Sequence, residues 1–156
     1  MNYKTNTGWE IWYHSIKDNN WDNSSYKKIF EINNLEDLFF FCDNINTNHL
    51  FNSMIFIMRD GIFPTWEDKN NKNGCLLCYK IKSDNILKEY TNIIKSLVSE
   101  NIHKNSEKYD LINGISVSPK KEFNILKIWI RDKSNDKILN YSTEFIKSEN
   151  MLYKKN

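Results

Sequence analysis

A tryptophan and a glutamate stand side by side at Trp66 and Glu67, within the polar stretch RDGIFPTWEDKNNKNGC at residues 59–75. A carboxylate can accept parallel hydrogen bonds from two adjacent donors, and the N1–H and exocyclic amine of guanine form such an edge. An indole ring can stack on the same base, which contributes about 1–3 kcal/mol. If methylation makes the base cationic, a cation–π attraction adds about 0.5–2 kcal/mol. The pair therefore has the chemistry to bind a cationic guanine.

A second aromatic ring would complete a sandwich around such a base. Trp21 is the candidate, because it stands alone in the polar segment DNNWDNS. The alternative for both loop tryptophans is that they only cover the core. Trp9 and Trp12 lie in an apolar run and are expected to pack within the sheet, whereas Trp129 could pack in the core or line the same site.

Composition limits the other classes of function. The 156 residues carry a net charge of +2, so any anion-binding site must be local. Cys75 and Cys78 form a C-x-x-C pair, but the third cysteine and the scattered histidines do not supply a second zinc-binding pair. We therefore expect no metal site and no cofactor. We also expect no enzyme activity, because the sequence shows no nucleophile–base pair.

The chain is expected to form one domain over residues 1–156, with a short tail at about residues 1–7. The N-terminus has no apolar signal core, and no segment approaches the roughly 18 apolar residues of a membrane span. The expected location is therefore the cytoplasm.

Hydrophobic periodicity predicts the elements that must position these residues. Strands are predicted at residues 8–16, 26–32, 53–61, 75–82, 114–118 and 123–132. Helices are predicted at residues 33–45, with Asn34 as N-cap, at residues 84–100, and at residues 135–150. In the last of these, the residues predicted to face inward are Ile138, Leu139, Phe145 and Ile146. Short connections between strands indicate an α+β fold with a mainly antiparallel sheet.

The strand at residues 123–132 has two distinct faces. Leu126, Ile128 and Ile130 point to one face and alternate with Lys127, Trp129 and Arg131 on the other. The apolar face is expected to meet the helices, and the face with tryptophan and cations is expected to be open to solvent.

The tryptophan spacing and the stretch DGIFPTWEDKNNKNG resemble the eukaryotic translation initiation factor 4E family, which binds the 7-methylguanosine cap of mRNA. That family carries a DGI-x-P-x-WED-x-x-N-x-x-GG stretch, and the segment LEDLF at residues 35–39 is similar to its first helix. The resemblance covers about residues 9–150. It implies a curved antiparallel sheet with three helices on the convex face and a ligand slot on the concave face.

The resemblance also implies which residues bind the base of the cap. Trp21 and Trp66 would stack on the two faces of the base. Glu67 would bind the guanine edge, and Trp129 would lie beside the methyl group.

The phosphate-binding positions depart from the family pattern. Lys120 matches one of them, and Lys121 lies next to it. Three positions that are cationic in the family carry other residues here: Leu76, Glu122 and Ile125. Lys80 shares the face of Leu76 by alternation and could compensate. The family also continues beyond the last residue with another strand and a basic loop, so we expect selectivity for the methylated base with a reduced contribution from the phosphates.

The convex face of the family binds partner proteins that carry a Tyr-x-x-x-x-Leu-apolar helix. Phe39 takes the place of the family's central tryptophan there, with Leu35 one turn earlier. The resemblance therefore implies capped mRNA as ligand and an initiation scaffold protein or a 4E-binding repressor as partner, for a monomer that does not contact membranes. Phe39 could equally be a packing residue of its helix.

Three functions remain open on these residues. The chain could recruit capped mRNA for translation initiation. It could instead sequester caps as a translational repressor, which the altered partner surface favours. A degenerate protein-interaction domain without cap binding is the third possibility, and the retained set Trp21, Trp66 and Glu67 argues against it.

Overall fold

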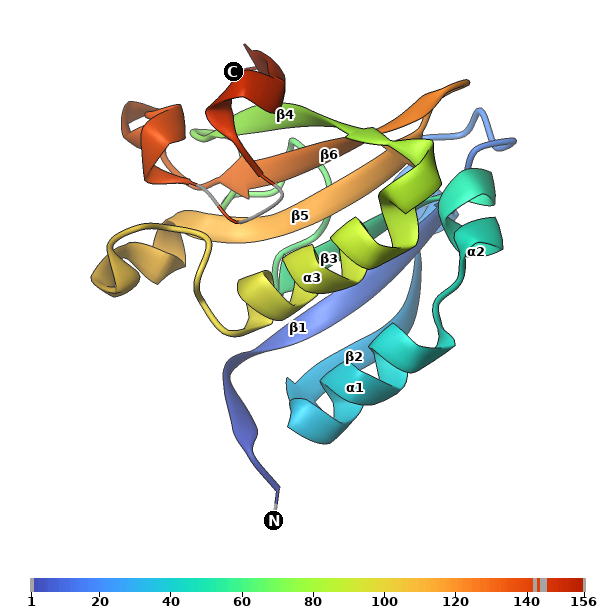
Figure 1. Ribbon diagram of the computed structural model, residues 1–156, viewed down its shortest axis with the longest axis horizontal. Helices are drawn as coiled ribbons and strands as arrows, with labels where there is room; N and C mark the ends of the chain where they lie inside the picture. The colour runs from blue at the N-terminus through green and yellow to red at the C-terminus, as the bar shows by residue number, and fades with distance from the viewer. Residues whose placement is uncertain (1, 142, 144–145, 156) are drawn as a thin grey trace.

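The computed structural model describes residues 2–141, 143 and 146–155. Within them, an open, curved sheet of seven antiparallel strands has the order β2-β1-β3-β5-β6-β4-β7 (Figure 1). The strands are β1 (Lys4–Ser15), β2 (Lys27–Asn34), β3 (Ser53–Arg59), β4 (Cys75–Lys82), β5 (Ile112–Pro119), β6 (Phe123–Ile130) and β7 (Met151–Lys155). The predicted α+β class with an antiparallel sheet is confirmed.

The helices lie on one face of this sheet (Figure 1). They are α1 (Leu35–Asn44), α2 (Thr47–Asn52) and α3 (Ile86–Val98). Asn34 caps α1 as predicted, because its side chain accepts a hydrogen bond from the backbone N–H of Asp37. The Asp37 carboxylate in turn accepts from the backbone N–H of Asn33, which fixes the turn from β2 into α1.

The sheet separates two apolar clusters. The larger cluster joins the helix-facing side chains of the strands, such as Trp9 and Ile128, to the inner stripe of α3. Burying this stripe contributes about 1.5–3 kcal/mol for each large aliphatic side chain. The smaller cluster lies on the other face and includes Phe56 and Trp129. Trp129 is only 7% exposed, so the expectation that its face is open to solvent is wrong at this position, because the ring packs in this apolar cluster.

The predicted helix at residues 135–150 is wrong. The described part of this segment contains short 3-10 turns at Lys133–Asn135, Ile138–Asn140 and Ser148–Asn150. Ile146 is buried as predicted, but Leu139 is 64% exposed, and Phe145 lies outside the described residues. Asparagine and serine, which are frequent here, bind nearby backbone groups and favour turns over a continuous helix.

β7 is a strand that the sequence interpretation missed. It pairs antiparallel with β4 and so covers that edge of the sheet. Its five residues are too few to give a clear alternation in the sequence.

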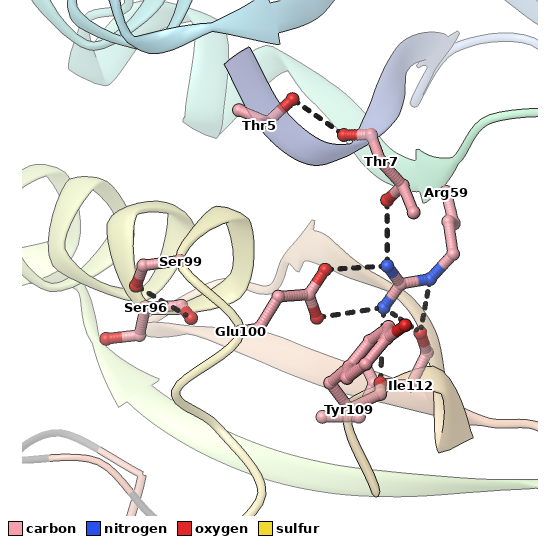
Figure 2. Close-up of polar contacts among 8 residues, drawn as sticks. All are labelled: Thr5, Thr7, Arg59, Ser96, Ser99, Glu100, Tyr109 and Ile112. Carbon is pink, nitrogen blue, oxygen red and sulfur yellow. Dashed lines mark hydrogen bonds and ion pairs between the residues drawn. The ribbon is translucent and has the colours of Figure 1, made fainter. Parts of the chain in front are cut away.

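A buried ion pair fixes the end of β3. The guanidinium of Arg59 donates to both carboxylate oxygens of Glu100, at 2.7 and 3.1 Å, and to the hydroxyl of Thr7 at 2.8 Å (Figure 2). It also donates to the backbone carbonyls of Tyr109 and Ile112. One arginine therefore ties β3, β1, the end of α3 and the segment before β5 together.

Glu100 holds this position at a conformational cost. It follows the C-cap of α3 with a φ of 62°, the left-handed region that usually selects glycine. Its N–H donates to the carbonyl of Leu97, and the N–H of Asn101 donates to that of Ser96, which completes a Schellman motif. The left-handed conformation favours glycine over glutamate at this position. The hydrogen bonds of the Glu100 carboxylate to Arg59 explain why a glutamate stands here instead.

Candidate functional site

A slot of about 720 Å³ opens on the sheet face opposite the helices. All four predicted base-binding residues line it: Trp21, Trp66, Glu67 and Trp129. They come from three separate parts of the chain, namely the β1–β2 connection, the β3–β4 loop and β6. The floor between them is apolar and is formed in part by Phe56 of β3.

The loop that carries Trp66 is shaped by the residue after Glu67. The carboxylate of Asp68 accepts hydrogen bonds from the backbone N–H groups of Phe63 and Asn70, at 3.0 and 2.8 Å. The buried side chain of Asn71 donates to the carbonyls of Phe63 and Thr65. Thus the two neighbouring carboxylates have different tasks: Asp68 orders the loop, and Glu67 remains available to the slot.

The return of this loop into β4 depends on Gly74. A Cβ atom at Gly74 would lie 1.8 Å from the carbonyl oxygen of Ile130, so no other residue fits. The second glycine of the family pattern is Cys75, which packs in the helix-side core.

Trp21 reaches the slot from a polar loop. It is 52% exposed, and its ring stacks on the buried ring of His14. The ring of Tyr26 packs edge-on against both of them. Burial raises the pKa of the Tyr26 phenol, and the charge of the nearby Glu67 carboxylate raises it further.

Trp129 is the most deeply buried of the three slot tryptophans. Its indole N–H donates to the hydroxyl of Ser116 on β5 at 3.1 Å. The ring of Phe56 contacts it edge-on at 6.4 Å between centroids. The orientation of the indole in the slot floor is therefore set before any ligand binds.

Cations line the slot in a different pattern from the one predicted. Lys120 lines it as expected, whereas Lys121 and Lys80 are not among the lining residues. The Lys80 ammonium instead lies 4.7 Å from the centre of the Phe123 ring. Lys127 lines the slot from β6. It is not among the predicted phosphate-binding residues, although its place two residues before Trp129 in a strand indicates that both lie on the same face.

One hydroxyl accompanies these lysines. Ser118 also lines the slot, and its buried Oγ has no hydrogen-bond partner among the described residues. Buried polar groups are normally hydrogen-bonded, so this hydroxyl is suited to a polar atom of a ligand.

The predicted partner-binding residues lie on α1, away from the slot. Phe39 is 52% exposed, and Leu35 is also exposed, so Phe39 does not pack in the core. Nearby, an apolar groove of about 210 Å³ lies between α1 and β2, with Ile29 and Phe41 among its lining residues.

The C-x-x-C pair does not form a metal site. Cys75 faces the helix-side core, and Cys78 belongs to the cluster on the opposite face, as alternation along a strand requires. Among the described residues, no group of three or more potential metal ligands occurs. No helix in the described part of the chain is long and apolar enough to span a membrane.

Known proteins resemble the chain over most of its length. The family model for eukaryotic initiation factor 4E matches residues 4–155. The eukaryotic translation initiation factor isoform 4E of Arabidopsis thaliana is 26% identical over 146 residues, which cover 88% of this chain and 71% of that protein.

Solved structures share the fold. The C. elegans factor eIF4E-3, in complex with the 4E-binding protein Mextli and a cap analog, has a TM-score of 0.77 at 22% identity and covers 87% of this chain and 78% of its own. The Ascaris suum eIF4E-3 structure with an m7G cap has a TM-score of 0.74 at 20% identity, over 87% of this chain and 77% of its own. Because the family model spans nearly the whole sequence, the chain belongs to the eukaryotic initiation factor 4E family, as a divergent member.

Proposed function

We propose that this chain binds the 7-methylguanosine cap of mRNA as a single domain over residues 1–156, without catalysing a reaction and in the cytoplasm. The observation that supports the proposal is the convergence of Trp21, Trp66, Glu67 and Trp129 on one slot. The Ascaris suum and C. elegans relatives in complex with a cap or a cap analog support the ligand class.

The slot residues divide the recognition of the base among them. The rings of Trp21 and Trp66 stack on its two faces, where its positive charge strengthens the contact. The Glu67 carboxylate accepts from N1–H and the exocyclic amine, and its negative charge strengthens both hydrogen bonds. Trp129 packs against the methyl group.

The phosphates bind to a smaller set of cations than in the family pattern. Lys120 and Lys127 are the lysines that line the slot, and the Ser118 hydroxyl lies on the same lining. Lys127 takes over from the cation missing at Ile125, since both residues lie on the same face of β6. Two cations should give a modest rather than a steep dependence of affinity on salt.

The exposed surface of α1 supplies the connection to other proteins. Leu35 and Phe39 leave apolar side chains in solvent on the face away from the slot. The C. elegans relative in complex with Mextli and the schistosome relative in complex with 4E-BP support a helical 4E-binding segment or an initiation scaffold as occupant. A scaffold would make the chain recruit mRNA for translation initiation, and without one it would sequester caps.

Tryptophan fluorescence during titration with 7-methyl-GTP tests this function directly. We expect quenching by 7-methyl-GTP and not by GTP. Trp66→Ala should weaken binding about 10- to 100-fold through lost stacking. Glu67→Gln should weaken it about tenfold or more through lost charge-assisted hydrogen bonds.

Glu36→Gln is the matched control, because Glu36 lies on α1 and does not line the slot. It should bind 7-methyl-GTP like the wild type. An equal response of the wild type to GTP and 7-methyl-GTP would contradict the proposal and favour a domain that acts only in protein assembly.

A further inference from the structure

His14 stands behind Trp21 on the slot face of the sheet. It is a fully buried residue of β1, paired with Met54 of β3. Its imidazole and the Trp21 indole are parallel, with 3.9 Å between ring centroids and 3° between ring planes. This is a face-to-face contact, so one face of the indole is already occupied and the other is left for the slot.

Trp21 has few other contacts that fix its plane. Its side chain is 52% exposed, and the ring of Tyr26 contacts it only edge-on, at 6.2 Å between centroids. The loop around it is polar, and the turns there are held by the side chains of Asp18 and Asn20. A freely rotating indole would have to be ordered during binding, and that ordering reduces affinity.

His14 also holds the loop that carries Trp21. Its Nε2 lies 2.9 Å from the carbonyl oxygen of Asn20, the residue directly before Trp21, and its Nδ1 lies 2.9 Å from that of Ser15. Both partners only accept hydrogen bonds. The tautomer that carries its proton on Nε2 therefore donates to the Asn20 carbonyl.

We propose that His14 is a positioning residue for base stacking, which rests on the proposed cap-binding function. Its ring is the outer layer of a stack in the order His14, Trp21, base, Trp66. It fixes the plane of Trp21 through ring contact and fixes the backbone at Asn20 through Nε2. The slot is therefore preorganised, and the ligand does not have to order the exposed indole.

Substitutions at His14 separate the ring from its hydrogen bonds. His14→Phe keeps a ring under the indole and should bind 7-methyl-GTP within about threefold of wild type. His14→Ala removes the ring and should weaken binding about tenfold, as expected for loss of an aromatic pair together with local order. The matched control is His103→Ala, because His103 is also buried and also contacts a ring, but that ring belongs to Tyr141, which does not line the slot.

The contact itself is measured without ligand. The chain has three histidines, so their ring protons are resolvable by NMR. The indole should shield the His14 ring protons, and Trp21→Leu should move these signals to ordinary values while those of His49 and His103 stay in place. Unchanged His14 signals in Trp21→Leu would overturn the proposal.

The affinity measurements distinguish this proposal from the function on which it rests. Wild-type protein that does not bind 7-methyl-GTP would overturn the proposed function and this role together. Tight wild-type binding that persists in His14→Ala would overturn the positioning role alone. An equal loss in His14→Phe and His14→Ala, with His103→Ala unchanged, would overturn the role of ring contact, because the hydrogen bond to Asn20 would then be the support.

Discussion

Lys127 lies on β6 two residues before Trp129, and it lines the slot. An ammonium group in a partly enclosed slot attracts phosphate more strongly than one on an open surface, because solvent screens it less. Lys127→Met should therefore weaken binding of 7-methyl-GTP about tenfold. It should have little effect on binding of 7-methylguanosine, the nucleoside that lacks the phosphates. The slope of log affinity against log salt should fall by about one.

Lys80→Met is the control for this substitution. Lys80 lies on the neighbouring strand and on the same sheet face, but its ammonium contacts the Phe123 ring and it is not a lining residue of the slot. It should keep both the affinity and the salt slope of wild type. If Lys80→Met loses affinity and Lys127→Met does not, then Lys80 binds the phosphates, as the sequence predicts, and Lys127 does not.

These two lysines show how far the sequence leads at the scale of single residues. Alternation correctly predicts a shared sheet face, because it depends only on strand geometry. It does not predict which lysine points into a cavity, since that depends on loops from distant parts of the chain. Trp66 and Glu67 were easier to find because their adjacent chemistry is visible in the sequence itself.

At the scale of elements, the Arg59–Glu100 pair joins β3 to the end of α3 (Figure 2). Removal of one partner leaves the other charge buried and unpaired, which costs about 3–5 kcal/mol. Arg59→Met should therefore lower the free energy of unfolding by about 3 kcal/mol or more in urea titrations. Glu100→Asn, which tolerates the left-handed backbone, should still lose most of this stability, because the carboxylate is the missing group.

Lys28→Met is a suitable comparison for Arg59→Met. Lys28 pairs with Glu31 at 2.7 Å on the exposed surface of β2, where solvent screening makes ion pairs weak. Lys28→Met should therefore shift the midpoint of urea unfolding far less than Arg59→Met does. Equal midpoints for the two variants would show that the buried pair does not hold these elements together.

The elements that the sequence predicted well are those in which a regular apolar pattern continues over many residues. α3 has a continuous apolar stripe, so its place on the sheet could be expected. Residues 135–150 have apolar residues at near-helical spacing, but tertiary contacts decide their conformation: Tyr141 pairs with His103 in an isolated bridge, and its hydroxyl donates to the carbonyl of Asn135 at 2.6 Å. Such contacts between distant or irregular segments have no period in the sequence.

At the scale of the whole molecule, one sheet separates two surfaces with different chemistry. The slot opens on one face, and α1 exposes Phe39 on the other. The sequence predicted this separation only through the family resemblance, because a single-strand pattern does not show which loops and helices meet on a face. The separation implies that the two binding activities can be lost independently.

Phe39→Ala tests this independence. Phe39 is 52% exposed, so its truncation should cost little stability, while removing an aromatic anchor should weaken binding of a Tyr-x-x-x-x-Leu-apolar peptide about tenfold or more. Affinity for 7-methyl-GTP should stay within about twofold. Both affinities are measured on the same protein, by fluorescence titration for the nucleotide and calorimetry for the peptide.

Two comparisons make the result decisive. Phe51→Ala removes another exposed phenylalanine, from α2, and should leave peptide binding unchanged if Phe39 is the anchor. Trp66→Ala should lose the nucleotide and keep the peptide, which is the reverse pattern. A parallel loss of both ligands in Phe39→Ala would mean that α1 and the slot are coupled through the sheet, and the two faces could then no longer be treated as separate sites.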